Sequence, residues 1–287
     1  MDKLIAVSQW VALLAIPQLV WRPHWDSYLA FIGGERAANV WGNFLLSALL
    51  LLCGNLFFAA VYALRWDCFE RHKVQRDKPW PWHSPAPGVA AKFAADVRTG
   101  ALLAALNLVL TVPLGAASYA NVKALGYSAS ARDFPSALTM AWQLAVFALV
   151  EDALFYWGHR ALHSVLYAHV HKVHHAFTTT VCIAATATHP VEYVLSNVLP
   201  FVAGPTLLGA HAATLYVWLI YRMGETMAHH SGYDFPWSMF SLLPGQGSAV
   251  EHDLHHSKQV GNYGSMFVFW DWACGTRVEA GGEGKEE

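Results

Sequence analysis

Residues 157–175 read WGHRALHSVLYAHVHKVHH, and the rest of the chain has to fold around this stretch. His159 and His163 are four residues apart, and His171 is followed three and four residues later by His174 and His175. On a helix, side chains at these spacings project from one face. The stretch therefore predicts imidazole rings that gather on one side of a helix, an arrangement that suits metal binding.

A second segment repeats this pattern far along the chain. Residues 251–256 read EHDLHH, in which His252 is followed three and four residues later by His255 and His256. Neutral imidazole is a common ligand of iron, zinc and copper, and the eight histidines of the two segments exceed what one four-coordinate zinc ion uses. The two segments together predict a site for two metal ions.

The composition places this site in a membrane protein. Of the 287 residues, 55% are hydrophobic and only 13% are charged, which lies outside the usual range of soluble domains. The net charge of -2 provides no basic field for nucleic acid. The four cysteines are widely scattered, without the paired spacing of a disulfide framework, and are predicted to be free thiols.

Four apolar stretches are close to the roughly 20 residues that a membrane span requires. They are residues 4–21, 40–64, 99–119 and 134–157, with Pro17 and Pro113 inside the first and third. Proline is tolerated in transmembrane helices more than in soluble ones. The predicted fold class is all-α: a multi-span membrane helical bundle with a cytosolic, histidine-rich cap that holds two metals.

The side of the membrane follows from the loop at residues 65–98, which carries seven basic residues against four acidic ones. The excess of Lys and Arg places this loop in the cytosol, and counting crossings from it places the first histidine cluster there as well. Residues 191–223 are apolar but too short for two full spans. A hairpin that dips into the membrane keeps both histidine segments on one side, whereas a single long span would separate them.

Four carboxylates are candidates to accept the second ring N–H of metal-bound histidines: Asp152, Glu225, Asp253 and Asp271. For each of them alone, an ordinary salt bridge or plain solvation is the simpler interpretation. The aromatic segments 218–221 and 267–272 could line a path for a lipid, although an aromatic stripe is more often core packing.

The histidine pattern differs from that of a zinc peptidase. An HExxH peptidase needs a Glu between its two histidines as general base, and Arg160 stands in that position here. Nitrogen ligands with open positions fit iron that reacts with dioxygen, and membrane embedding fits a lipid substrate. The residues alone do not choose between iron, zinc and copper.

The sequence resembles a known family. The segments HRALH, HKVHH and HDLHH are similar to the three histidine boxes HX3H, HX2HH and HX2HH of the fatty acid hydroxylase and sterol desaturase superfamily. The flanking segments YAHVHKVHH, THPVEY, ETMAHHSGYDFPW and GNYGSMFVFWDWACGT resemble the C-4 methylsterol monooxygenase branch most. The likeness covers residues 136–277, the predicted catalytic domain. Residues 1–135 form the predicted membrane part with its cytosolic loop, and 278–287 a solvated tail.

The resemblance implies a non-haem centre of two iron ions in the endoplasmic reticulum membrane, facing the cytosol, although zinc can replace iron during recombinant expression. It implies electrons from cytochrome b5 or its reductase, and a sterol or other lipid as substrate. By position in the family pattern, the implied ligands are His159, His163, His171, His174, His175, His189, His230, His252, His255 and His256. Of these, His189 and His230 lie outside the three boxes.

Departures from the family pattern leave alternatives open. Family members commonly carry another His where this chain has Glu251, and an acidic residue where it has Ala176. The di-lysine retrieval signal of some members is missing from the terminal GGEGKEE. The first alternative is a hydroxylase or desaturase of another lipid (a fatty acid, a C-5 sterol, or an alkane or aldehyde). The second is a lipid-binding membrane protein without turnover, and the third a zinc hydrolase.

Overall fold

The computed structural model describes residues 1–279, and within them the fold is helical, with no strand beyond two isolated bridges. This confirms the predicted all-α class. The predicted tail 278–287, with GGEGKEE at 281–287, lies almost wholly outside the described residues. The helices are α1 (Asp2–Ile16), α2 (Arg22–Ile32), α3 (Glu35–Ala37), α4 (Asn43–Leu64), α5 (Asp67–Glu70), α6 (Val89–Ala124), α7 (Ala137–Ser164), α8 (Pro190–Glu192), α9 (Leu199–Leu207), α10 (Ala212–His229), α11 (Ala249–Lys258) and α12 (Phe269–Cys274).

Short turns of other helical types complete the described chain. Wide π-type turns at Pro17–Trp21 and Ala38–Gly42 join α1 to α2 and α3 to α4, and a third at Tyr193–Val198 joins α8 to α9. Tight 3₁₀ turns form at Pro81–His83, Ala131–Asp133, His171–Ala176, Cys182–Thr186 and Met239–Ser241. The second histidine box therefore lies on a 3₁₀ turn and not on the α-helix that its spacing predicts.

Four helical segments are long and apolar enough to cross a membrane: Asp2–Ile32, Glu35–Leu64, Val89–Ala124 and Ala137–Ser164. Each overlaps one of the four predicted spans and extends beyond it at one end at least. The fourth differs most, because Ser136 caps its start by accepting a hydrogen bond from the Thr139 amide at 3.1 Å. The same helix continues past the predicted end at 157, so that His159 and His163 lie on its last two turns.

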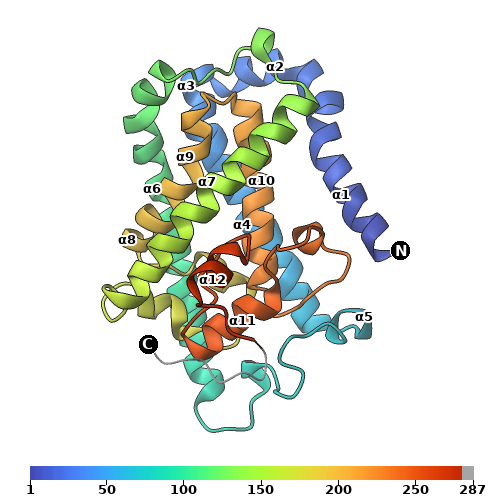
Figure 1. Cartoon of the computed structure of the whole chain (residues 1–287), viewed down its shortest axis with the longest axis vertical. Helices are drawn as coiled ribbons and strands as arrows, with labels where there is room; N and C mark the ends of the chain where they lie inside the picture. Colours follow the sequence, from blue (N-terminus) through green and yellow to red (C-terminus); the bar gives the residue numbers. More distant parts are fainter. Residues whose placement is uncertain (280–287) are drawn as a thin grey trace.

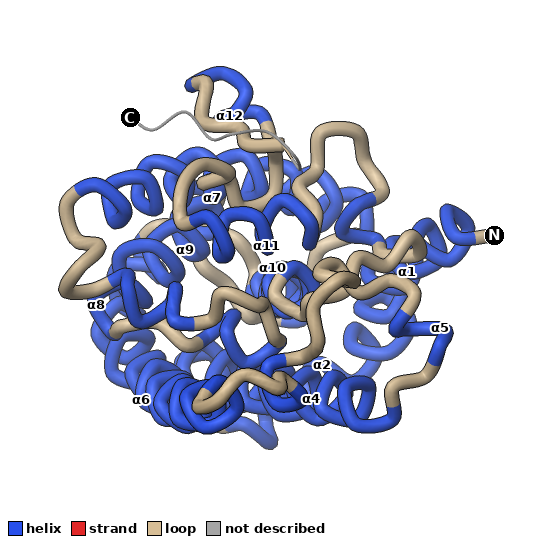
Figure 2. Tube along the Cα trace, turned by 90° about the horizontal axis from the view of Figure 1, so that it is seen from below, coloured by secondary structure: helices blue, strands red, loops and turns tan. Residues whose placement is uncertain are grey.

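Helices α6 and α10 run roughly along the long axis of the molecule, α1 and α7 cross it obliquely, and the histidine-bearing segments gather at one end (Figure 1). Figure 2, seen from that end, shows α10 near the middle, with α7 and α9 on one side and α4 and α6 on the other. We call residues 65–88, 165–189 and 230–279, which cover this end, the cap. The helices α1, α2, α4, α6, α7, α9 and α10 form the bundle.

Residues 191–223 turn back on themselves, as expected for a hairpin. The chain runs away from the cap through α9, reverses at residues 208–211 and returns through α10 (Figure 1). Gly209 permits the turn: its φ is +53°, and a Cβ there would lie 2.6 Å from the carbonyl oxygen of Leu125. Gly204 lets α9 approach α7, since a Cβ there would lie 2.7 Å from the Cα of Phe147. The reversal brings both histidine segments to the same end.

Candidate metal centre

Four separate elements supply the histidines of the centre. The last two turns of α7 carry His159 and His163, four residues apart on one face. The 3₁₀ turn after α7 carries the second box, and His230 follows the last residue of α10. Helix α11 carries the third box. Its N-cap is Ser248, whose hydroxyl accepts from the Glu251 amide at 3.3 Å, and the Glu251 carboxylate pairs with Arg277 at 3.0 Å, so Glu251 has a local structural role.

Nine of the ten predicted ligands meet in two adjacent groups. The first group contains His159, His163, His171, His175 and His255, and the second contains His174, His230, His252 and His256. Within each group the possible ligand atoms all lie within 4.8 Å of one another. Because the two groups meet at neighbouring positions in the second and third boxes, they occupy one site and not two remote ones.

The HX2HH spacing explains how the groups interlock. In the second box, the residues four apart, His171 and His175, turn to the first group, and His174 turns to the second. In the third box the assignment is reversed, because His255 joins the first group while His252 and His256 join the other. The second and third boxes therefore each contribute to both groups, which couples the positions of the groups closely.

The Nε2 atoms face one another at distances below ordinary van der Waals contact. His171 Nε2 lies 3.1 Å from that of His159, 3.0 Å from that of His163 and 3.0 Å from that of His175. In the second group the Nε2 atoms of His230 and His252 are 2.8 Å apart. Such convergence of one atom type, with its lone pairs aimed inward, is the arrangement that a bound cation requires.

Hydrogen bonds at the opposite ring nitrogen fix the orientation of four of these imidazoles. The Nδ1 atoms of His159 and His255 donate to the carbonyl oxygens of Tyr263 (3.0 Å) and Gly261 (2.6 Å). In the same way, His256 and His230 donate to backbone carbonyl oxygens, at 3.1 Å and 2.7 Å respectively. A carbonyl oxygen only accepts, so in a neutral ring Nδ1 carries the proton and Nε2 keeps its lone pair for a metal.

Glu192 lies beside a fifth imidazole, and no pattern in the sequence singles it out. Its Oε1 lies 2.9 Å from Nδ1 of His171, and both side chains are buried. A carboxylate on the second nitrogen of a metal-binding histidine sets the tautomer and raises the basicity of the ring. Its only signal in the sequence is its place in THPVEY, because nothing about its spacing relates it to His171.

His189, the tenth predicted ligand, belongs to neither group. Its Nδ1 accepts a hydrogen bond from the Val191 amide at 3.1 Å and thereby caps the start of α8, directly before Pro190. The histidine before a proline thus has a local structural role here, and we leave it out of the ligand set that we propose below.

The four carboxylates proposed as partners of the histidines contact other groups. Asp152 accepts from the amides of Met266 and Phe267, and Asp253 accepts from the side chains of Gln75 and Thr180. Glu225 pairs with Arg222. Asp271 accepts from the Tyr263 and Gly264 amides at 2.8 and 2.7 Å. It thereby holds the loop whose Tyr263 carbonyl accepts the hydrogen bond from His159. These carboxylates shape the cap around the histidines without touching them.

The surroundings keep the cap histidines neutral. Burial lowers the pKa of His230 to about 4 and holds the pKa values of His174, His252 and His255 well below the usual value for histidine. A neutral imidazole is the form that ligates a metal. The donor set, nine imidazoles in two groups, seven of them buried, therefore fits two transition-metal ions of the kind that prefer nitrogen ligands.

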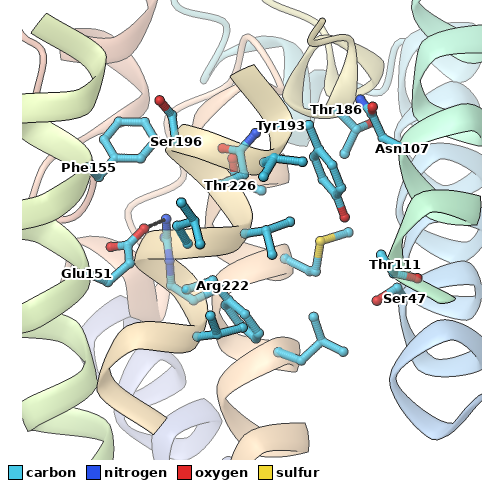
Figure 3. A pocket seen from close by; sticks show the side chains of 18 of the residues that line it. Ser47, Asn107, Thr111, Glu151, Phe155, Thr186, Tyr193, Ser196, Arg222 and Thr226 are labelled. Atoms are coloured by element: carbon cyan, nitrogen blue, oxygen red, sulfur yellow. Dashed lines mark hydrogen bonds and ion pairs between the residues drawn. The ribbon is translucent and has the colours of Figure 1, made fainter. Parts of the chain in front are cut away.

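An apolar cavity of about 540 Å³ extends from this centre into the bundle between α4, α6, α7, α9 and α10. His159, His171 and His174 form part of its wall at the cap end. Phe155 and Thr226, one helical turn before His159 and His230, line the next level (Figure 3). The volume lies within the range of sites that enclose a small hydrophobic ligand.

The cavity wall also contains one buried ion cluster, two helical turns from the histidines. Arg222 donates to Glu151 at 2.8 Å and to the Ser265 hydroxyl at 2.7 Å, and it also pairs with Glu225 (Figure 3). Trp218 and Tyr221 pack in the core beside this cluster. The wall residues at 218–221 and 267–272 include Leu219 but none of the aromatic side chains, so their aromatic rings are packing residues.

The fold and the site together define a class: an all-helical protein with membrane-length helices and a buried histidine centre beside an apolar cavity. A sequence profile of the fatty acid hydroxylase family matches residues 144–276. The chain is 34% identical over 256 residues to a very-long-chain aldehyde decarbonylase of Oryza sativa, covering 88% of this chain and 89% of that protein. The chain belongs to the fatty acid hydroxylase superfamily and is an oxidoreductase of that superfamily.

Two further relatives are methylsterol monooxygenases. One, from Arabidopsis thaliana, is 35% identical over 239 residues, which is 82% of this chain and 84% of the relative. Another, from Aspergillus fumigatus, is 42% identical over 149 residues, half of each chain. No solved structure matches the chain. The comparisons support a lipid oxygenase.

Proposed function

We propose that the protein is a membrane-bound non-haem di-iron oxygenase that oxidises the C-4 methyl group of a sterol precursor. The observation that supports this most is the position of the two histidine groups at the cap end of an apolar cavity: His159, His163, His171, His175 and His255 beside His174, His230, His252 and His256. These nine residues would hold two iron ions. When bound, the irons supply dioxygen activation and removal of hydrogen from an unactivated methyl.

The chain's own residues perform the rest. The backbone carbonyls of Tyr263 and Gly261 and the carboxylate of Glu192 keep Nε2 of their histidines free for the metal. The bundle encloses the substrate away from water, and Phe155 and Thr226 stand between the centre and the deeper cavity. In each cycle a methyl, O2, two electrons and two protons give an alcohol and water. Repetition carries the alcohol to the aldehyde and the acid.

The topology supports a cap that faces the cytosol of an endoplasmic reticulum membrane. The loop at residues 65–98, with its excess of Lys and Arg, lies at the same end of the bundle as the histidines (Figure 1). Electrons would then arrive on this side from cytochrome b5 or its reductase.

Membranes containing the protein, a 4,4-dimethylsterol, NADPH and the reductase test the assignment. The proposal predicts a 4-hydroxymethyl product and its further oxidation products, all absent from a His255→Ala variant. Consumption of the sterol at another position, or no consumption while the protein retains iron, would contradict it. Protein purified without air or chelator should contain iron. Zinc in aerobically purified protein would not decide the native metal.

A second substrate class is supported by the relative from Oryza sativa, which is named a very-long-chain aldehyde decarbonylase. A long-chain aldehyde could occupy the same cavity with its carbonyl at the histidines. Incubation with a long-chain aldehyde distinguishes the two: an alkane one carbon shorter would favour this substrate over the sterol.

A further inference from the structure

A second pocket, of about 420 Å³, lies in the cap away from the histidines. It forms where the chain leaves α4 and folds back before α6, within residues 65–83. Its charged lining residues are Arg65, Lys73, Arg76, Lys78, Glu70 and Asp77. Four cations therefore surround one small concave space, against two acids.

The two acids leave an excess of two positive charges in the pocket. Glu70 is already engaged, because its Oε1 accepts from the Tyr233 hydroxyl at 2.6 Å and from the Trp80 indole at 3.3 Å. Within residues 1–279, none of the four pocket cations forms a salt bridge. Clustered cations that form no salt bridge repel one another, so an anion between them would lower the energy of the folded chain.

Lys73 forms the base of the pocket. Only 7% of its surface is exposed, its ammonium lies 4.6 Å from the centre of the Trp80 ring, and it donates to the Lys78 carbonyl. Burial lowers the pKa of this ammonium, a desolvation cost that a bound anion would offset. The other cations, Arg65, Arg76 and Lys78, are exposed at the rim. The pocket therefore has a buried cationic base and an exposed cationic rim.

The pocket lies at the end of a candidate membrane span, at the expected level of the membrane surface. No charged residue occurs between Arg36 and Arg65, and apolar side chains such as Leu56 and Leu64 remain exposed up to the last turn of α4. Arg65 is the first charge after this candidate span, and Trp66 beside it is 54% exposed. An exposed Trp next to a cation at the end of a span is typical of the headgroup layer.

We propose that this pocket binds the phosphate of an anionic membrane lipid. A phosphate group fits between several Lys and Arg side chains, and basic pockets at the ends of membrane helices bind lipid headgroups in this way. The acyl chains would follow the exposed apolar side of α4. A concave space with a buried ammonium at its base suits one small anion better than the broad acidic surface of a protein.

A phosphate bound in this pocket would also stabilise the cap next to the metal centre. The pocket segment pairs with the chain after His230: the Val74 amide donates to the Gly232 carbonyl at 2.9 Å, and the Asp234 amide to the His72 carbonyl at 2.9 Å. A lipid phosphate would thus hold residues 65–83 against the segment that follows His230, one of the proposed metal ligands. The binding itself does not depend on the function proposed above.

The test uses the full chain in lipid nanodiscs with spin-labelled phosphatidylglycerol or phosphatidylcholine, and measures the immobilised fraction of each label. We expect a preference for phosphatidylglycerol. Arg76→Gln combined with Lys78→Gln should weaken that preference about thirtyfold, from roughly 1 kcal/mol for each cation at the membrane surface. The matched control, Lys92→Gln with Arg98→Gln, removes two exposed cations at the same end of the molecule and should retain the preference.

Several results would overturn the proposal. An equal loss in both double variants would mean general surface charge and no specific pocket. Displacement of the label by inorganic phosphate, but not by chloride at equal ionic strength, would identify soluble phosphate as the ligand. An unchanged lipid preference in the pocket variant, together with lost binding of an acidic protein such as cytochrome b5, would make the surface a protein-docking site. None of these measurements depends on sterol oxidation, so they test lipid binding independently of the proposed enzymatic activity.

Discussion

The bundle and the cap are built in opposite ways. The bundle consists of long apolar helices, and many of its large side chains face outward, as Leu49, Leu52 and Leu56 of α4 do. The cap consists of short helices, turns and loops that bury many polar side chains, His171, His255 and His256 among them. In the bundle, the backbone satisfies its own hydrogen bonds, whereas in the cap each buried imidazole needs a specific partner. A change in the cap should therefore impair chemistry, and a change in the bundle should mainly impair stability.

The largest effect should follow from removing a proposed ligand in the cap. His255→Ala removes one imidazole from the first group, which has five histidines. We expect loss of metal from that group and a fall in sterol oxidation beyond about a hundredfold, since even outer partners of metal ligands contribute ten- to a hundredfold. Metal analysis beside product analysis measures both.

His189→Ala is the matched control for this prediction. His189 caps α8 and lies outside both groups, so its loss should reduce stability by about 1 kcal/mol and leave metal content unchanged. If His189→Ala released metal to the same extent as His255→Ala, the division into two groups of five and four would be wrong.

A smaller effect is expected at Glu192, which orients a ligand from outside. Glu192→Ala removes the partner 2.9 Å from Nδ1 of His171 and should lower metal affinity ten- to a hundredfold. Glu192→Gln, which can still accept a hydrogen bond, should recover part of this loss. Metal competition with a chelator gives the affinity. Equal affinities in all three proteins would remove Glu192 from the centre.

In the bundle, Arg222→Met tests stability and not metal binding. It leaves Glu151 and Glu225 without their cation in a buried place, which should destabilise the fold by about 3–5 kcal/mol. Thermal unfolding in detergent measures the change. Restoration by the triple variant Arg222→Met, Glu151→Gln and Glu225→Gln would support this cause. A stable Arg222→Met protein with lost metal would contradict the separation of bundle from cap.

The smallest effect should come from the cap helix α11. Ser248→Ala removes the hydroxyl that accepts from the Glu251 amide and should reduce stability by about 1 kcal/mol. Ser248→Asp restores an N-cap and should recover it. Denaturant unfolding compares the two, and equal midpoints for Ser248→Ala and the unchanged protein would show that α11 is held by its histidines alone.

The two regions also differ in what the sequence could predict. The spans follow from uninterrupted apolar runs, and the prolines and glycines at Pro200, Gly204, Pro205 and Gly209 indicated the hairpin that brings the histidines to one end. In the cap, the box spacing named eight residues that do meet, and the resemblance to the family added the ninth, His230. The spacing could not distribute them between the two groups, because the second box lies on a 3₁₀ turn and its neighbours come from α10 and α11.

The partners of the histidines could not be predicted for a physical reason. Four of them are backbone carbonyls, such as those of Tyr263 and Gly261, which every residue possesses and no pattern marks. The carboxylates expected in that role bind backbone amides, hydroxyl and amide side chains, or Arg222 instead. His189 was included through resemblance alone, and only the fold shows that its ring nitrogen is used by the Val191 amide.

The most direct test of the account is the metal content of each group. Protein purified without air from iron-rich medium should contain about two irons per chain, one for each histidine group. His255→Ala and His256→Ala, which strike different groups, should each release iron chiefly from their own group. Intact chain that binds no metal, or a single ion whose loss follows from either variant alike, would contradict a centre of two ions.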